Sequence, residues 1–285
     1  MKHFKATLDS VLNQTLSADE VLVIDDGSTD ETAAFAESYG PPLRVFRRTN
    51  QRQAAARNFG AQVASGEWIA LLDHDDIWEP NKLERQMEEL ARHPDADICY
   101  TGRVLLMQKG NATTLGGVID VPPAEDIRRS LFKGVTFLPS AALIRRSTLL
   151  AVGGFDPKMC HGSDDYDMWL RLLHAGAKFA ACREPLVQYR RHEGNWSLDK
   201  EWFDECIEIY RRLVLPYLPK STRWIALNRF RSIHECDFAF SLREKGDPKC
   251  LSMMAHSILH SPFVDPLRYK VLAHMLYSRL NVRIR

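Results

Sequence analysis

Over its first two thirds, the chain alternates two patterns of apolar residues. Apolar positions at helical spacing predict helices over residues 4–14, 29–39, 53–64 and 81–92, and one that begins at Ser163 or Asp164. Short continuous apolar runs predict strands over residues 21–24, 43–46, 68–72, 98–107, 137–144, 179–181 and 186–189. Alternating strands and helices up to about residue 192 predict an α/β domain.

Two segments depart from this alternation. Residues 110–123 have little periodicity, so we interpret them as a loop and a candidate lid. Beyond residue 197 the strand pattern stops, and helices are predicted over residues 202–215, 224–243, 248–260 and 266–281. We therefore predict an α/β domain over residues 1–197 and a helical C-terminal region over residues 198–285.

Charge and cysteine usage narrow the possible partners and the compartment. The chain has 38 Lys and Arg against 37 Asp and Glu, and this net charge of +1 does not favour nucleic acid. The six cysteines form no close pair, which fits a reducing cytoplasm. The first residues do not resemble a signal peptide, and no apolar run approaches the roughly 20 residues of a membrane span. We therefore expect a cytoplasmic protein.

The C-terminal helices could serve acceptor binding, dimerisation or contact with a membrane surface. Their basic end fits the anionic inner face of a membrane, because cationic segments bind such surfaces. The alternative is a helical lid packed on the core with a solvated charged face. The basic residues are Arg268, Lys270, Arg279, Arg283 and Arg285.

Acidic residues follow two of the predicted strands. The run at 68–72 leads into Asp73-His74-Asp75-Asp76, and the run at 21–24 leads into Asp25-Asp26-Gly27-Ser28. If both runs are parallel strands of one sheet, the two clusters share the edge where α/β sheets bind ligands. Packed carboxylates repel each other, and a divalent ion with a phosphate substrate relieves that repulsion. The alternatives are an exposed acidic helix cap and a simple turn.

These motifs and their order resemble glycosyltransferase family 2, the inverting nucleotide-sugar-dependent enzymes of the GT-A fold. The resemblance covers about the first two thirds of the chain. It implies a Rossmann-like, mostly parallel central sheet flanked by helices. The matching segments are residues 10–15, VLVIDDGSTDET at 21–32, 56–60, 64–67, LLDHDDIWEPNKL at 71–83, 153–156, 163–172 and 189–192.

The resemblance also implies an activity and a cofactor. The enzyme would be of hexosyltransferase type and would move a sugar from a nucleoside diphosphate donor to a hydroxyl of a saccharide or lipid-linked acceptor. Such chemistry belongs to polysaccharide biosynthesis at the cell envelope. Mg²⁺ or Mn²⁺ would assist by binding the diphosphate, with Asp75 as the direct ligand and Asp73 sharing the metal and ribose site.

Residue roles on the nucleotide side follow from the same resemblance. Asp26 would bind the base, with Asp25 nearby, and a carboxylate that accepts a ring N–H favours UDP- or dTDP-sugars. Arg57 would contact the base or the phosphates, and Arg190 and His192 would neutralise the pyrophosphate. The alternatives are a surface helix residue for Arg57 and a solvated basic strand end for Arg190 and His192.

On the acceptor side, Asp165 would be the general base that deprotonates the attacking hydroxyl. Asp164 stands where the family usually has glutamate, so its shorter side chain leaves its role open. The alternative for both residues is a pair of helix N-terminal acids without chemistry.

Two departures from the family pattern stand out. The family has a strand before its first helix, whereas this chain starts inside that helix, so we expect an unpaired sheet neighbour and an incomplete pocket. Either the natural protein is longer, which the intact downstream acids favour, or the transferase is degenerate. Arg52 stands where the family often has glycine.

Two rival functions remain open. One is a non-catalytic nucleotide-sugar-binding protein on the same fold. The other takes Asp73-His74-Asp75 as the nucleophile and acid of a haloacid-dehalogenase-like phosphotransferase, which the chain resembles locally. That family expects Thr or Val where Ile77 stands.

Overall fold

The computed structural model describes residues 3–109, 112–191, 200–244 and 247–261, together with Tyr269 and Leu272. The chain divides into two compact units, and each is considered by itself. The first comprises Met1–Cys160 and Asp164–Asn195, and the second comprises His161–Ser163 and Trp196–Arg285. This division lies beside the boundary predicted between residues 197 and 198.

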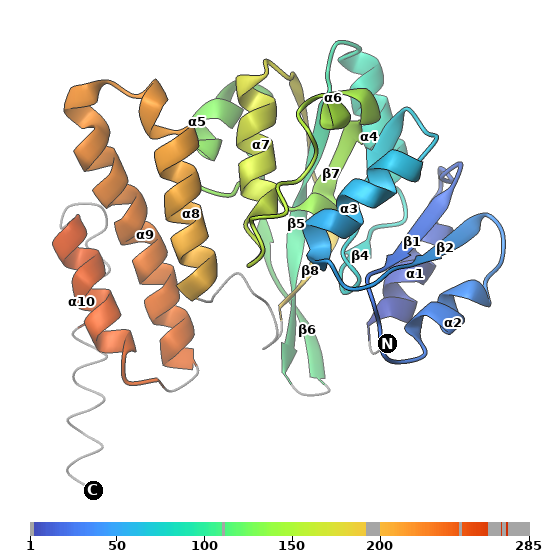
Figure 1. The fold of residues 1–285 in the computed structure, drawn as a ribbon, viewed down its shortest axis with the longest axis horizontal. Helices are drawn as coiled ribbons and strands as arrows, with labels where there is room; N and C mark the ends of the chain where they lie inside the picture. Colours follow the sequence, from blue (N-terminus) through green and yellow to red (C-terminus); the bar gives the residue numbers. More distant parts are fainter. Residues whose placement is uncertain are drawn as a thin grey trace, which may run out of the picture. The chain divides into compact units, whose positions relative to one another are not determined.

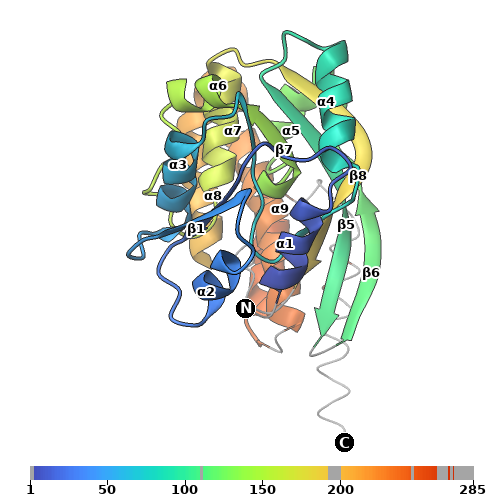
Figure 2. The same ribbon diagram turned by 90° about the vertical axis from the view of Figure 1, so that its right-hand side faces the viewer.

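A small parallel sheet forms the N-terminal part of the first unit (Figure 1, Figure 2). Its strands β1 (Val21–Asp25) and β2 (Leu43–Arg47) pair in register, so that Asp25 lies opposite Arg47. Apolar side chains of α1 (Phe4–Leu12) and α2 (Thr32–Glu37) pack with both strands in one core cluster. Among the described residues, β1 pairs with β2 alone, so each of these two strands has one edge without a strand partner there.

A larger sheet of six strands forms the rest of the first unit. Five of its strands follow the order β3-β7-β5-β8-β4. The sixth, β6, pairs with the second half of β5. The β5–β8 pair is parallel, whereas the β3–β7, β5–β7, β4–β8 and β5–β6 pairs are antiparallel. The strands are β3 (Trp68–Ala70), β4 (Ile77–Trp78), β5 (Ile98–Lys109), β6 (Ala112–Ile119), β7 (Ala142–Arg145) and β8 (Phe179–Arg191).

The α/β class is confirmed, but two expectations about pairing are wrong. β1 and β3 belong to separate sheets, whereas we expected both in one parallel sheet. The larger sheet is mixed, whereas we expected mostly parallel pairing. The physical reason is that an apolar run indicates a buried strand, while its neighbours and direction depend on contacts remote in sequence.

The prediction of a loop over residues 110–123 is also wrong. Ala112–Ile119 forms β6, which extends an antiparallel hairpin with β5. Nearly all of β6 is exposed, so its side chains do not alternate between a buried and a solvated face. Without that alternation the strand has no period-two signal.

Two further strand predictions need smaller corrections. The strands expected at 179–181 and 186–189 are one continuous strand, β8. The strand expected over 137–144 begins as the short 3-10 helix η2 (Pro139–Ala141) and continues as β7. A proline at the start of η2 removes a backbone donor, which disfavours a strand there.

Helices connect and cover these strands (Figure 1). α3 (Arg52–Val63) contacts β1, and α4 (Lys82–Arg92) contacts β5 and β8. α7 (Asp164–His174) is buried along most of its length because apolar residues occupy most of its positions. The 3-10 helix η1 (Ala124–Asp126) and the short helices α5 (Ile127–Leu131) and α6 (Arg146–Ala151) were not predicted.

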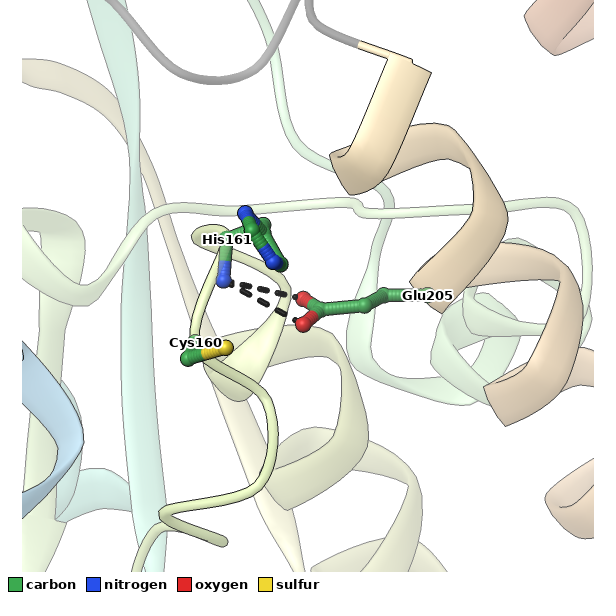
Figure 3. Close-up of side chains that lie close together, drawn as sticks. All are labelled: Cys160, His161 and Glu205. Carbon is green, nitrogen blue, oxygen red and sulfur yellow. Dashed lines mark hydrogen bonds between the residues drawn. The ribbon is translucent and has the colours of Figure 1, made fainter.

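The second unit is helical, with α8 (Lys200–Leu213), η4 (Leu215–Tyr217), η5 (Lys220–Thr222), α9 (Arg223–Glu244) and α10 (Cys250–His260). The hydroxyls of Ser232 and Ser257 each donate to the other residue's carbonyl, at 2.7 and 2.8 Å. The backbone N–H of His161 donates to both carboxylate oxygens of Glu205 on α8, each at 3.2 Å (Figure 3).

The helices predicted over residues 202–215, 224–243 and 248–260 correspond to α8, α9 and α10, whereas the last predicted helix and the basic residues are largely outside the described residues. The helix expected over 266–281 lies outside them apart from Tyr269 and Leu272, which are helical. The basic residues Arg268, Lys270, Arg279, Arg283 and Arg285 lie outside them as well. Among the helices that are described, none has the length and apolar character that crossing a bilayer requires.

Candidate active site

The first half of α3 connects the end of β1 with the start of α7. The backbone N–H of Gln51, which precedes α3, donates to both carboxylate oxygens of Asp26 at 3.0 and 3.1 Å. Two residues later, the Gln53 side chain donates to Asp164 at 2.6 Å. The two acidic segments are therefore linked through one short stretch of chain, although they lie far apart in the sequence.

Arg57, one turn further along α3, joins a third segment to these two. Its guanidinium donates to Asp73 at 2.5 Å and to Asp164 at 2.8 Å. The side chain of Arg57 is 12% exposed and that of Asp164 is fully buried, so water screens this ion pair weakly. Burial opposes the charge of Arg57, but Asp73 and Asp164 outweigh burial and raise its pKa. Arg57 therefore neutralises two acids that would otherwise repel each other.

Asp164 and Asp165 open α7 side by side and are both buried. Burial raises the pKa of Asp164, against the lowering effect of Arg57. Burial and the neighbouring Asp164 raise the pKa of Asp165 to about 7. The backbone N–H of Tyr166 donates to Asp165 at 2.6 Å and holds one carboxylate oxygen. A carboxylate with this pKa both accepts and releases a proton near neutral pH, as a general base must.

The acidic segment after β3 forms a tight turn. The backbone N–H of Asp76 donates to the carbonyl of Asp73 at 3.2 Å, and the N–H of Asp73 donates to the Ser140 hydroxyl at 3.1 Å. Arg190 on β8 holds the other side, with its N–H donating to the Asp76 carboxylate and its Nε donating to the carbonyl of Asp75. Arg190 is itself buried, so the interpretation as a solvated strand end does not fit it.

Asp76 is the least solvated acid of this turn. It is 1% exposed, and its Oδ2 atom is buried without a hydrogen-bond partner among the described residues. Burial, followed by the charges of Asp73 and Asp75, raises its pKa well above the ordinary range. We did not predict a role for Asp76. The sequence signal that could have identified it is its place directly after Asp75 and before the apolar pair of β4.

This turn suits a hard divalent cation. Its donor set consists of carboxylate and carbonyl oxygens, which Mg²⁺ and Mn²⁺ prefer. A cation held there would offset the repulsion from Asp73 and Asp75, which adds to the effect of burial in raising the pKa of Asp76. Asp73 and Asp75, both half-buried, are the carboxylates that could hold it.

The remaining predicted nucleotide-site residues are placed as follows. Asp25 is buried and accepts the backbone N–H of Ser28 at 2.9 Å, so its carboxylate shapes the Asp-Gly-Ser turn. Asp26 is half-buried at the end of β1. His192 lies outside the described residues. The sequence reasoning missed Gln53 and Ser140, because neutral residues that bind remote acids carry no local signal.

A bracket of hydrogen bonds positions the loop before α7. Asn58 on α3 donates to the carbonyl of Phe155 at 2.8 Å and accepts the Phe155 N–H at 2.7 Å. A Cβ atom on Gly154 would lie 2.2 Å from the Asn58 side-chain oxygen, and the φ of Gly154 is +69°. Arg171 on α7 donates to the carbonyl of Gly154 at 2.6 Å. These contacts explain why this loop needs glycine.

Arg52 at the start of α3 has a φ of 69°, and it is the sole non-glycine residue with positive φ in the described chain. The left-handed conformation favours glycine, which agrees with the glycine that the family often has at this position. The Arg52 guanidinium donates to the carbonyl of Cys160 at 3.3 Å. The predicted departure therefore coincides with a strained backbone position.

The architecture is that of the GT-A fold which the sequence predicts. The chain is similar to S. aureus TarS, solved in complex with UDP-GlcNAc, with a TM-score of 0.62 and 18% sequence identity. The match covers 91% of this chain and 78% of that chain. This likeness confirms the fold.

The family model named Glycosyl transferase family 2 matches residues 2–152, which is more than half of the 285 residues. The chain belongs to glycosyl transferase family 2. It is 28% identical to an uncharacterized glycosyltransferase of Rickettsia typhi over 86% of this chain and 77% of that protein. It is also 28% identical to the putative glycosyltransferase EpsE of Bacillus subtilis, over 74% of this chain and 78% of that protein.

Proposed function

We propose that the protein is an inverting glycosyltransferase that moves a sugar from a nucleoside diphosphate donor to an acceptor hydroxyl. The observation that supports this most is the buried pair at the start of α7. Asp165 has its pKa raised to about 7, next to Asp164, which Arg57 joins to Asp73. This arrangement provides a base beside the acidic turn where a donor diphosphate would bind.

In the proposed reaction, Asp165 accepts the proton of the acceptor hydroxyl as that oxygen attacks the anomeric carbon from the face opposite the leaving group. Base catalysis of this kind is worth about 10²–10⁴-fold in rate. Asp164 and Arg57 would hold the base and the acidic turn at a constant separation, since both are bound on two sides. The configuration at the anomeric carbon would invert because a single displacement occurs.

The donor would lie between the acids after β1 and those after β3. Asp26, next to the buried Asp25, would accept a ring N–H of the base, which favours UDP- or dTDP-sugars. S. aureus TarS has been solved in complex with UDP-GlcNAc and with UDP, which supports a uridine donor. Arg190, at the turn of Asp75 and Asp76, would face the pyrophosphate.

Asp75 and Asp73 would hold Mg²⁺ or Mn²⁺ at this turn. When bound, the ion would stabilise the negative charge that develops on the departing diphosphate. The acceptor would be a saccharide or a lipid-linked molecule, and the reaction would serve polysaccharide biosynthesis. A cytoplasmic location with peripheral membrane contact stays a prediction.

Hydrolysis and transfer assays with UDP-sugars, with Mn²⁺ and with chelator, test the proposal. We expect metal-dependent turnover, which Asp75→Ala abolishes. The matched control is Asp95→Ala, because Asp95 is an exposed acid paired with Lys178 on the surface. Unchanged turnover in Asp75→Ala would refute the metal role. Calorimetry that shows donor binding without turnover would select the non-catalytic alternative.

A further inference from the structure

The first unit contains a cavity of about 250 Å³ beside the β5–β6 hairpin. Three segments contribute to it: β5, the end of β6 with the residues after it, and α5 with the chain that follows. None of these residues belongs to the acidic turn or to the start of α7. The cavity is lined by Arg103, Ile119, Asp120, Pro122, Ser130, Lys133, Gly134, Val135 and Thr136.

Arg103 lines this cavity with part of its hydrogen-bonding capacity unused. Its Nε atom is buried and has no hydrogen-bond partner among the described residues. Its Nη1 atom donates to the carbonyl of Thr136 at 3.5 Å, the outer limit for such a bond. Burial lowers the pKa of Arg103, although arginine stays charged at neutral pH. A buried guanidinium with a donor unused is unfavourable unless an anion completes it.

The other lining groups add to the positive character of the cavity. Lys133 contributes a second cation, and the hydroxyls of Ser130 and Thr136 contribute donors. Asp120, which is exposed, is the one carboxylate among the lining residues. The two cations therefore outnumber the acid. A cavity lined by several donors suits a phosphate, because phosphate oxygens accept bonds in several directions.

The cavity adjoins the acceptor side of the site. The Tyr166 hydroxyl, on the residue after Asp165, donates at 3.0 Å to the carbonyl of Leu131 on α5, directly after the lining residue Ser130. The charges of Asp76 and Asp165 also act on Arg103. Asp165 is the base in the proposed reaction, so a group bound at Arg103 would lie near the hydroxyl that loses its proton. The donor diphosphate, in contrast, would lie at the acidic turn.

We propose that this cavity binds a phosphate group of the acceptor, so that the acceptor is a phosphate-bearing saccharide or polyol. This inference rests on the proposed function, because it assigns the acceptor for the same reaction. The phosphate accepts a hydrogen bond from the guanidinium of Arg103 and forms an ion pair with Lys133. Its attachment places a neighbouring hydroxyl beside Asp165.

Binding of inorganic phosphate to the full chain tests the site without any need for turnover. Calorimetry is run on the wild type, Arg103→Gln and Lys133→Gln, with Arg128→Gln as the matched control. Arg128 is an exposed arginine on α5 that stacks on Phe132 and does not line the cavity. Each cavity variant should weaken binding at least about tenfold, since one charge-assisted bond is worth that much. Arg128→Gln should bind as the wild type does.

Two results would overturn the inference. One is phosphate binding that survives in both cavity variants, which would place the anion elsewhere. The other is no binding by the wild type. Lys133 is exposed, so its variant remains informative if Arg103→Gln fails to fold. Donor hydrolysis is measured separately: its absence would count against the proposed function and the acceptor assignment, whereas the phosphate site itself is tested by binding alone.

Discussion

Arg57 and Asp164 form an ion pair at 2.8 Å between residues 107 apart in the sequence. The pair joins α3 to the start of α7, and the same guanidinium reaches Asp73 after β3. A single cation therefore holds together two acids that the proposed reaction needs at fixed places. The stability of the unit and the geometry of the site depend on the same contact.

Replacing Arg57 with Gln should destabilise the protein strongly. Asp164 would lose its cationic partner while it remains fully buried, and breaking one side of a buried ion pair costs about 3–5 kcal/mol. Urea unfolding measures this loss. The matched variants are Asp164→Asn and the double mutant, in which neither member of the pair is left as a lone charge. If the losses of the two single variants simply add in the double mutant, the pair is not coupled.

The pH dependence of activity should report Asp165. Its pKa of about 7 predicts that turnover rises with pH and reaches half its maximum near pH 7, because the base must be ionised. Asp165→Asn should lower turnover by about 10²–10⁴-fold. The measurement is kcat/KM for transfer as a function of pH. An acidic limb that stays near pH 4 in the wild type would contradict the role of burial.

The same group makes a prediction for stability. The folded-state pKa of Asp165 is raised above the ordinary value of 3.8, so ionisation opposes folding. The contribution of Asp165 to stability should therefore decrease as pH rises from about 4 to about 7. Asp165→Asn should remove this loss and gain up to about 4 kcal/mol at pH 8. Urea unfolding at pH 4 and pH 8 checks it; an equal effect of the substitution at both pH values would show that the charge is not responsible.

Gly154 and Gly153 form a matched pair for testing the bracket at Asn58. Both have positive φ, but a Cβ on Gly154 would lie 2.2 Å from Asn58, whereas a Cβ on Gly153 would meet no atom within 4 Å. Gly154→Ala should therefore destabilise by at least about 2 kcal/mol more than Gly153→Ala. Thermal or urea unfolding of both variants measures the difference. Equal losses would mean that backbone conformation, and not the contact with Asn58, is what requires glycine.

Arg52→Gly should stabilise the protein. The left-handed conformation costs a non-glycine residue about 1–2 kcal/mol, and the greater freedom of glycine in the unfolded chain offsets part of that. We expect a net gain of about 1 kcal/mol in the free energy of unfolding. Arg52→Ala is the control, because it removes the contact with Cys160 and keeps the strain. A gain of the same size in Arg52→Ala would assign the effect to the lost side chain.

The elements that local pattern predicts well are those whose periodicity reflects burial. α4 and α7 each place apolar residues on a buried face, and the strands β1 and β5 are apolar runs. β6 escaped prediction because its side chains are exposed on both faces. Whether β1 and β3 share a sheet depends on which strand lies beside each, and no single segment encodes that.

The candidate site divides in the same way. Acids that end strands or begin a helix, such as Asp26, Asp73 and Asp165, are visible from the residues and their order. Gln53 and Ser140 are visible in the structure alone, because each acts by binding an acid far away in the sequence. The burial that separates Asp76 from its neighbours also arises from packing and not from residue type.

The two sheets of the first unit have a consequence for heating. β1 and β2 bond to each other and to no strand of the larger sheet within the described residues, so α3 carries much of the alignment between Asp26 and Asp73. Loosening this helix would separate the two acids while most strands keep their hydrogen bonds. Turnover should then disappear several degrees below the midpoint of melting, and the enzyme would lose its action before it loses its shape.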